Sequence, residues 1–338
     1  MISAIYGAGA MGTVLGAYLS RAGEQVDLIN RNVGHIKGLK EHGAQIVGQT
    51  QFTQKVHALL PQEMKKQYDI IFLMTKQLDN ASIVKSLVPF LKKDGVICTM
   101  QNGLPELSVS KIIGEEKTIG CAMAWGATLI GNGVSELTSE ATKETLSFSL
   151  GSFGNVDNLH FQEVKRLLEI MGNVDVESNW IGARWAKLLV NSAFSGLSAI
   201  LNATFGEVAK DKTSRKLVQK VIKECIDVAN IAGIKIEPIQ GKDIVKLLDW
   251  KGPIKKAISF MIIPIAIKKH QLLKSSMLQD LSKGKKCEIE AINGVVCEYG
   301  DQVSIATPIS DRIVEIVHKI EANQLKPDWS NLTLFSDL

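Results

Sequence analysis

The first half of the chain alternates short apolar runs with segments of helical periodicity. The apolar runs predict strands at residues 3–6, 25–30, 68–75 and 95–100. The helical patterns between them cover residues 10–22 and 81–88. Residues 68–75 are apolar at almost every position, which is typical of a strand buried on both faces. This strand–helix–strand repetition predicts a parallel sheet with right-handed crossover connections.

Two stretches of this half are less regular. Residues 43–58 are mostly polar with scattered apolar positions, and they predict a small hairpin or an irregular excursion. Residues 122–151 are rich in Gly, Thr and Ser and contain strand-like pieces such as residues 145–150.

Beyond about Gly172 the strand patterns nearly vanish and helical patterns replace them. These helical patterns lie at residues 181–201, 215–232, 242–248 and 305–322. The chain is therefore predicted to hold an α/β domain, residues 1–176, followed by an all-helical domain, residues 177–338. The tail after Pro327 is weakly specified.

A glycine motif follows the first predicted strand and opens the first predicted helix. It reads Gly7-Ala8-Gly9-Ala10-Met11-Gly12, a G-x-G-x-x-G. Gly7 permits the tight turn, Gly9 lets the backbone approach a pyrophosphate, and Gly12 lets helix and strand pack closely. The helix N-terminus then offers free N–H groups to the phosphates. The context predicts a Rossmann-type dinucleotide-binding domain, the alternative being a glycine-rich turn without a ligand.

The end of the second predicted strand bears on which nicotinamide cofactor is bound. An Asp or Glu there would bind the ribose 2′-hydroxyl of NAD, whereas this chain has Asn30 and Arg31. Arg31 can form a forked pair with a 2′-phosphate, and Lys76 adds a second positive charge. Asp27 falls earlier in the strand and is expected off the site. We therefore predict NADP(H), unless Arg31 and Lys76 are solvated surface cations.

The first long helix of the second half carries a polar stripe. Lys187, Asn191 and Ser195 are spaced i, i+4, i+8, so they share one face of an otherwise apolar helix. A lysine in such a stripe is costly to bury unless it is paired or works as an acid or base. The alternative is a lysine that snorkels at a domain edge. Further along, Ser276 lies in a polar cluster, and Glu288 and Glu290 open the next helix, where they could also simply complement its dipole.

Composition narrows the function classes. The 338 residues are 45% hydrophobic and 22% charged, as in an ordinary globular protein. A net charge of +4 is too weak to indicate nucleic acid but suits a small anionic ligand. Five dispersed cysteines without a Cys-x-x-Cys pair indicate a reducing compartment and no metal site. The apolar stretch 257–267 is shorter than the about 20 residues of a membrane span, and no secretory signal is visible, so we expect a cytoplasmic protein.

Taken together, these residues resemble the ketopantoate reductase family (2-dehydropantoate 2-reductases). The markers run through nearly the whole chain: GAGAMG at the N-terminus, Lys76, QNGL at 101–104, WAKLLVN at 185–191, SSMLQD at 275–280 and EIEAING at 288–294. The resemblance implies an oxidoreductase that uses NADPH to reduce a 2-keto acid to a 2-hydroxy acid, in pantothenate and coenzyme A synthesis. Its partner would be that small acid, with neither nucleic acid nor a membrane involved.

The resemblance also implies roles for single residues. Lys187 matches the catalytic lysine, which as an ammonium would give its proton to the carbonyl oxygen, and Glu288 matches a motif glutamate that acts in catalysis and beside the cofactor. Substrate-binding roles fall to Asn102, Asn191, Ser195 and Ser276. Cofactor-binding roles fall to Gly7, Ala8, Gly9, Ala10, Met11, Gly12, Arg31, Lys76, Asn102 and Glu288. The site is expected in the cleft between the two domains.

Two positions depart from the family pattern and leave the substrate open. Ser195 stands where the family often has an asparagine, and another substrate-binding asparagine is replaced near Phe205. The alternatives are a reductase of a different 2-keto acid, including an opine-type or related hydroxy-acid dehydrogenase, and a non-catalytic nicotinamide-binding protein. The apolar stretch 257–267 must bury its face somewhere, which allows a homodimer through the helical domain.

Overall fold

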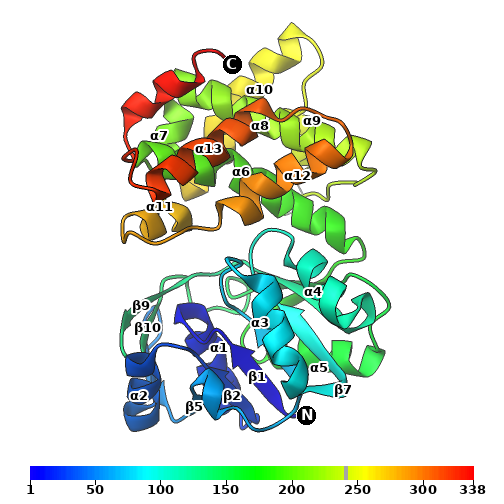
Figure 1. The fold of residues 1–338 in the computed structure, drawn as a ribbon, viewed down its shortest axis with the longest axis vertical. Coiled ribbons are helices and arrows are strands. Elements are labelled where there is room, and N and C mark those ends of the chain that lie inside the picture. Colours follow the sequence, from blue (N-terminus) through cyan, green and yellow to red (C-terminus); the bar gives the residue numbers. More distant parts are fainter. Residues whose placement is uncertain (240–242) are drawn as a thin grey trace. The chain divides into compact units, whose positions relative to one another are not determined.

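A computed structural model describes residues 1–239 and 243–338 (Figure 1). By their internal contacts the residues group into an N-terminal unit, Met1–Trp180, and a C-terminal unit, Ile181–Leu338. The N-terminal unit holds a mostly parallel sheet with helices, and the C-terminal unit is helical, which confirms the predicted fold class. Among the described helices none is both long enough and apolar enough to cross a membrane.

The main sheet has eight strands in the order β12-β11-β8-β7-β6-β1-β2-β5. Their bounds are β1 Ser3–Tyr6, β2 Val26–Ile29, β5 His57–Leu59, β6 Tyr68–Leu73, β7 Leu91–Thr99, β8 Thr118–Met123, β11 Phe148–Ser152 and β12 Val174–Val176. All neighbours pair in parallel except β11, which runs antiparallel to β8. The four predicted strands are thus present, although β7 begins at Leu91 rather than Gly95.

A hydrophobic core lies on each face of this sheet. Side chains of α1 (Ala10–Arg21) and α5 (Asn158–Glu169) join one core, and side chains of α3 (Asn80–Leu87) and α4 (Pro105–Ile113) join the other. The central strand β6 buries residues toward both cores, with Phe72 in the first and Ile71 in the second. This two-sided burial explains why its sequence is nearly all apolar.

A second, four-stranded sheet covers α1 on the side away from the main sheet. The predicted hairpin in residues 43–58 forms as β3 (Ala44–Gly48) and β4 (Phe52–Gln54). The Gly-rich segment 122–151 supplies β9 (Ala127–Gly131) and β10 (Val134–Leu137), and β10 pairs in parallel with β3. Helix α1 contacts β3, β9 and β10, so it is packed between two sheets. The sequence pattern did not indicate this pairing.

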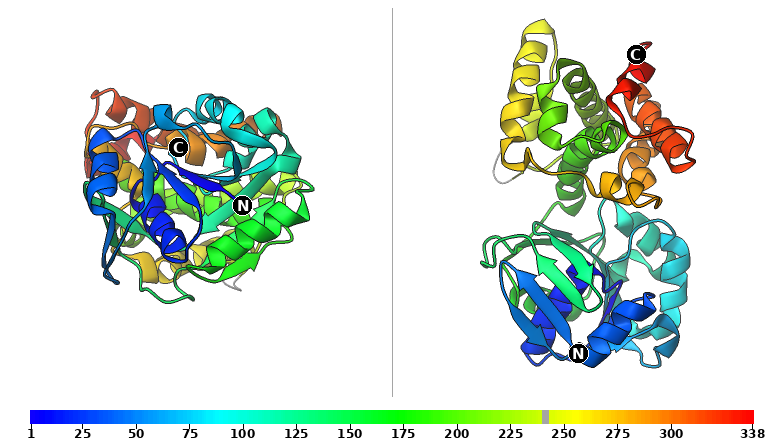
Figure 2. Two further views of the ribbon diagram at one scale, coloured as in Figure 1. Left: turned by 90° about the horizontal axis from the view of Figure 1, so that it is seen from below. Right: turned by 90° about the vertical axis from the view of Figure 1, so that its left-hand side faces the viewer.

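The C-terminal unit consists of helices, shown from two further sides in Figure 2. Their bounds are α6 Trp180–Leu201, α7 Phe205–Lys210, α8 Lys212–Ile231, α9 Ile244–Leu248, α10 Pro253–Ala266, α11 Ser276–Leu281, the π-helical turn η5 Glu290–Gly294, α12 Val295–Gln302 and α13 Pro308–Glu321. Helix α13 begins three residues later than predicted because Pro308 takes its first position, which suits a residue without an N–H. Lys242, the predicted start of α9, lies outside the described residues. The tail forms a 3₁₀ segment, Trp329–Phe335.

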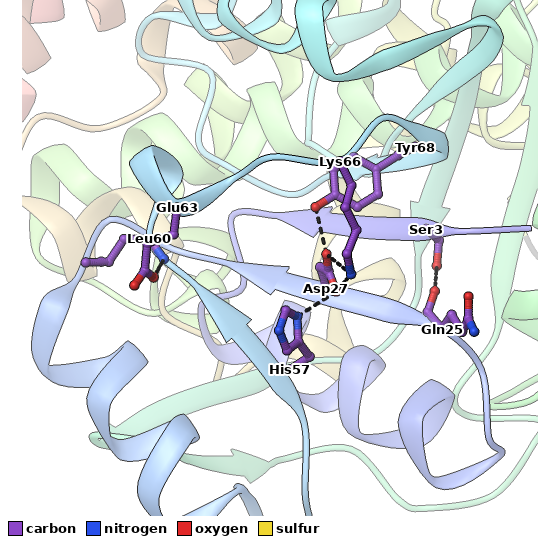
Figure 3. Close-up of polar contacts among 8 residues, drawn as sticks. All are labelled: Ser3, Gln25, Asp27, His57, Leu60, Glu63, Lys66 and Tyr68. Atoms are coloured by element: carbon purple, nitrogen blue, oxygen red, sulfur yellow. Dashed lines mark hydrogen bonds and ion pairs between the residues drawn. The ribbon is translucent and has the colours of Figure 1, made fainter.

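Asp27 takes part in a polar cluster at the amino ends of the strands (Figure 3). The carboxylate is buried, accepts a hydrogen bond from the hydroxyl of Tyr68 at 2.7 Å, and contacts His57 Nδ1 at 2.7 Å and Lys66 Nζ at 3.2 Å. Burial, together with the hydrogen bond to Asp27, raises the pKa of Tyr68. The carboxylate of Asp27 is therefore held by these three side chains, at the end of the strands opposite the glycine motif.

Candidate functional site

Four neighbouring strands of the main sheet end at one edge. Tyr6 at the end of β1 lies opposite Ile29 of β2 and Leu73 of β6, and Leu73 lies opposite Thr99 of β7. The segments that follow these strand ends carry the predicted cofactor residues of the N-terminal unit: Gly7 to Gly12, Arg31, Lys76 and Asn102. Parallel pairing thus brings together residues that are spread over nearly a hundred positions of sequence.

The first and third glycines of the motif sit where a side chain would collide. Gly7 has a φ of +97°, and a Cβ there would lie 2.5 Å from the backbone nitrogen of Thr75. A Cβ on Gly12 would lie 3.0 Å from the carbonyl oxygen of Gly7. At Gly9 the nearest atom is 3.9 Å away, so that position is open. Two glycines therefore serve packing, and the middle one leaves room for a ligand.

The start of α1 fits an anionic group. Gly9 is its N-cap and offers no side-chain oxygen, and no acidic residue lies in the first turn. The N–H groups of Ala10, Met11 and Gly12 come too early in the helix to have intrahelical acceptors, and the positive end of the helix dipole adds to them. Buried Ala8 precedes this turn, and its N–H donates to the carbonyl oxygen of Ile29. This arrangement fits the pyrophosphate of a dinucleotide.

Arg31 stands on a tight turn after β2. The side chain of Asn30 accepts a hydrogen bond from the N–H of Asn32, and Asn32 in turn caps helix α2 (Val33–His42). The guanidinium is exposed, and within the described part of the chain no carboxylate pairs with it. Burial raises the pKa of neighbouring Tyr6, and the positive charge of Arg31 partly opposes that rise. Arg31 is thus free to bind a phosphate beside the end of β1.

A buried glutamine ties together the turns that carry Lys76 and Asn102. The amide of Gln101 donates to the carbonyl oxygen of Thr75 at 2.9 Å and to the side chain of Asn80 at 2.8 Å. Its oxygen accepts a hydrogen bond from the hydroxyl of Thr99. From the sequence, Gln101 was recognised only within the QNGL motif. A polar residue directly after a buried strand is the signal that points to this role.

His35, on α2, supports the glycine motif from behind and was missed by the sequence analysis. Its Nδ1 accepts a hydrogen bond from the N–H of Gly133 at 3.0 Å, so the ring proton is on Nε2. Nε2 lies 3.0 Å from the carbonyl oxygen of Ala8 and 3.1 Å from the hydroxyl of Thr13. Burial lowers the pKa of His35, although the bond to Ala8 opposes this. A neutral histidine therefore links the motif to the second sheet.

In the C-terminal unit, α6 presents the predicted polar stripe. Lys187 and Asn191 are half-buried and Ser195 is 8% exposed, while the residues around them, such as Leu188 and Leu189, are buried. Phe205 opens α7 and stacks on Phe194 with ring centroids 5.4 Å apart. The position near the missing asparagine is therefore apolar core.

Ser276 is exposed at the start of α11 and is placed by its neighbour. Ser275 caps this helix, accepting a hydrogen bond from the N–H of Leu278, and its own N–H donates to the hydroxyl of Ser198 on α6 at 3.3 Å. Ser198 lies one turn beyond Ser195. The contact therefore brings the start of α11 next to the end of the polar stripe.

Glu290, one of the two glutamates in the segment 288–294, pairs with a histidine of α13. Glu290 contacts His318 Nε2 on α13 at 2.6 Å. Burial lowers the pKa of His318, but Glu290 and Glu321 raise it by more, so the net shift is upward. Glu288 lies in a bend directly before the helical turn that begins at Ile289. Residues 1–239 and 243–338 contain no group of three or more His, Cys, Asp or Glu side chains placed to hold a metal.

Comparison with known proteins gives a consistent result. The family model described as "Ketopantoate reductase PanE/ApbA" matches residues 3–148, and the model of its C-terminal part matches residues 179–321. The 2-dehydropantoate 2-reductase of Streptococcus pyogenes serotype M1 is 26% identical over 325 residues, covering 95% of this chain and 98% of the relative. That of Pyrococcus horikoshii is 29% identical over 308 residues, covering 90% and 93%.

Solved structures agree over a similar span. A D-mandelate dehydrogenase in a ternary structure with NADH and anilino(oxo)acetate superposes with a TM-score of 0.81, at 27% identity, covering 96% of this chain and 99% of that one. A PanE/ApbA family ketopantoate reductase from Ralstonia eutropha JMP134 gives a TM-score of 0.80 at 25% identity, with the same coverage.

The histidine behind the glycine motif gives a pH dependence with a definite sign. Burial depresses the pKa of His35 in the folded chain, whereas in the unfolded chain the pKa has its ordinary value of about 6.5. As the pH falls, the unfolded chain therefore takes up the proton first, so the contribution of His35 to the free energy of unfolding is complete above about pH 6.5 and is lost below it. We expect the drop in denaturation midpoint between pH 7.5 and 5.5 to be smaller in His35→Gln than in wild type. The control is His160→Gln, which removes another buried histidine. An equal drop in wild type and His35→Gln would contradict this assignment.

Proposed function

Because the chain belongs to the ketopantoate reductase PanE/ApbA family, we propose that it reduces 2-dehydropantoate (ketopantoate) to pantoate with NADPH, in pantothenate and coenzyme A biosynthesis. At the broader level it is an NAD(P)-dependent 2-keto acid reductase of that family. The polar stripe of α6 supports the proposal most directly, because a half-buried lysine shares one helix face with two further hydrogen-bonding side chains. We also propose a cytoplasmic location.

The cofactor would be held by the strand ends of the N-terminal unit. The open position at Gly9 and the start of α1 suit the pyrophosphate, and Arg31 with Lys76 suits a 2′-phosphate. Asn102 and Glu288 complete the proposed cofactor contacts. When bound, the reduced nicotinamide supplies the hydride. Family relatives include a D-mandelate dehydrogenase crystallised with NADH, so the preference for NADPH rests on Arg31.

The side chains of the C-terminal unit would handle the keto acid. Hydride arrival at the carbonyl carbon leaves negative charge on the oxygen, and the Lys187 ammonium donates the proton that completes the alcohol. Asn191 and Ser195, one and two turns along α6, hydrogen-bond the substrate, and the Ser276 hydroxyl binds its carboxylate. Glu288 orients the lysine or the substrate and balances the local charge.

A second candidate is the reduction of a different 2-keto acid. Ser195 is shorter than an asparagine, and the ring of Phe205 packs on Phe194 where the family has a polar group. Both changes favour a bulkier, more apolar substituent on the keto acid, and one structural relative is a D-mandelate dehydrogenase. Rates of NADPH oxidation with ketopantoate and with phenylglyoxylate separate the two candidates. NADPH binding without turnover of any keto acid would identify a non-catalytic binding protein.

The lysine of the α6 stripe is tested by truncation. We expect Lys187→Ala to lower kcat about 10²–10⁴-fold, because a positioned general acid contributes that much, while the Kd for NADPH stays unchanged. The matched control is Lys212→Ala, which removes an exposed lysine at the start of α8. Full activity of Lys187→Ala would show that another group donates the proton.

The cofactor preference is tested at the turn after β2. We expect Arg31→Ala to weaken NADPH binding roughly 10-fold to 100-fold, the size of a hydrogen bond to a charged group, with little effect on NADH. Isothermal titration with both cofactors measures this, and Arg21→Ala, on the last turn of α1, serves as control. Equal weakening of both cofactors would remove the argument for a 2′-phosphate site.

An exposed apolar face on α10 is proposed as a homodimer interface. Ile254, Ile258, Met261 and Ile265 are 77%, 46%, 65% and 71% exposed, and their spacing places them on one helix face. With Leu272 beyond the helix, the face is large for a monomer. Two copies paired about a twofold axis would each bury on the order of several hundred Å², which approaches the ~800 Å² per partner of a standard interface.

Sedimentation velocity tests the dimer. We expect a wild-type dimer that the double change Met261→Lys with Ile265→Lys dissociates, while Leu159→Lys, on the exposed side of α5, leaves it intact. Lys255 in the first turn of α10 and Lys268 just beyond the helix would repel the same lysines of a second copy across such an interface, so added salt should tighten the dimer. A protein that stays monomeric at all concentrations would contradict the proposal. A monomer that binds anionic vesicles, with the binding weakened by salt, would also contradict it.

A further inference from the structure

Asn293 is a fully buried polar residue that the proposed chemistry leaves unused. It lies in the π-helical turn η5, and its side-chain amide donates to the carbonyl oxygen of Ser192 on α6 at 3.0 Å. Ser192 directly follows Asn191. The hydrogen bond therefore joins the turn after Glu288 to the part of α6 that carries the polar stripe.

Helix α6, the π-helical turn η5 and helix α13 pack closely around Asn293. A Cβ on Gly196 would lie 3.0 Å from Asn293 Oδ1 and would overlap Ile313 of α13, so the glycine lets the three elements meet. Asn293 Oδ1 itself is buried, and the described residues offer it no hydrogen-bond partner. An unpaired buried acceptor lowers stability, so stability alone does not account for an asparagine here. Single π-turns inside helices are frequent at functional sites, because the extra residue changes the direction of the side chains that follow or precede it.

The other end of the same segment is also held. The N–H of Cys287 donates to Glu321 Oε1 on α13 at 2.8 Å, and Glu290 pairs with His318 on that helix. Glu288 thus lies between two anchors to α13, at Cys287 and Glu290, and the Asn293 anchor to α6 follows further along the same segment. Without the Asn293 anchor, the segment would remain attached to α13 but would lose a fixed register against α6.

We propose that Asn293 is a positioning residue of the keto-acid reductase, which holds the Glu288 segment in register with Lys187 and Asn191 on α6. The inference rests on the proposed function. It concerns side chains of the C-terminal unit alone, so the affinity for the cofactor pyrophosphate and 2′-phosphate should not depend on it. A displacement of about 1 Å at reacting groups can cost about 10²-fold in rate.

The test compares two buried asparagines that both donate to α6. Asn331 is 6% exposed and donates to the carbonyl oxygen of Ile200, near the far end of the helix, and to that of Lys326. For Asn293→Ala we expect kcat to fall about 10-fold to 100-fold and KM for the keto acid to rise, with the ratio of the Kd values for NADPH and NADH, which Arg31 is proposed to set, within about two-fold of wild type. For Asn331→Ala we expect a comparable loss of thermal stability with kcat and KM unchanged.

Two further variants separate the hydrogen bond from the volume. Asn293→Leu nearly keeps the size but has no hydrogen-bond donor, so it should lose kcat as Asn293→Ala does. Asn293→Ser keeps a donor and should lose less, and it carries the comparison if Asn293→Ala does not fold. Equal kcat in Asn293→Ala, Asn331→Ala and wild type would show that Asn293 is merely structural. A wild type that reduces no 2-keto acid would instead overturn the proposed function, and with it this role, before any variant is compared.

Discussion

Parallel pairing of four adjacent strands is the constraint on which the candidate site depends. Every crossover returns the chain to the same starting end of the strands, so the carboxyl ends of β7, β6, β1 and β2 lie along one edge of the sheet. The loops after those ends are the segments free to carry polar groups, since the strands themselves are buried on both faces. Glycine turn, arginine, lysine and asparagine therefore gather there without any attraction among themselves.

Behind three of the segments that would touch a ligand stands a buried polar residue that fixes the backbone. His35 holds the carbonyl oxygen of Ala8, and Gln101 holds that of Thr75. In the helical unit, Ser198 holds the start of α11. Such contacts are made to main-chain atoms, which leaves the side chains in front of them free for binding. The same buried side chains cost free energy if left unpaired, so they specify one arrangement of the loops.

The sequence predicted what depends on local spacing and missed what depends on distant pairing. The glycine motif and the stripe of Lys187, Asn191 and Ser195 follow from separations of a few residues, so they could be located without coordinates. The pairing of β3 with β10 could not be predicted in this way, because β10 is short, polar in part and about ninety positions away. The occupation of Asp27 by Tyr68, His57 and Lys66 likewise depends on three separate segments, although its place early in β2 already indicated that it lay off the site.

The parallel pairing of β3 with the distant β10 has a consequence for how the N-terminal unit folds. A chain still being synthesised can form β1, α1 and the β3–β4 hairpin early, yet one side of α1 has no finished cover until β10 has been added. Contacts between segments so far apart close a large loop and slow folding. During that interval the apolar flank of α1 is open to solvent, and this is the stage at which a nascent chain of this protein most needs protection from aggregation.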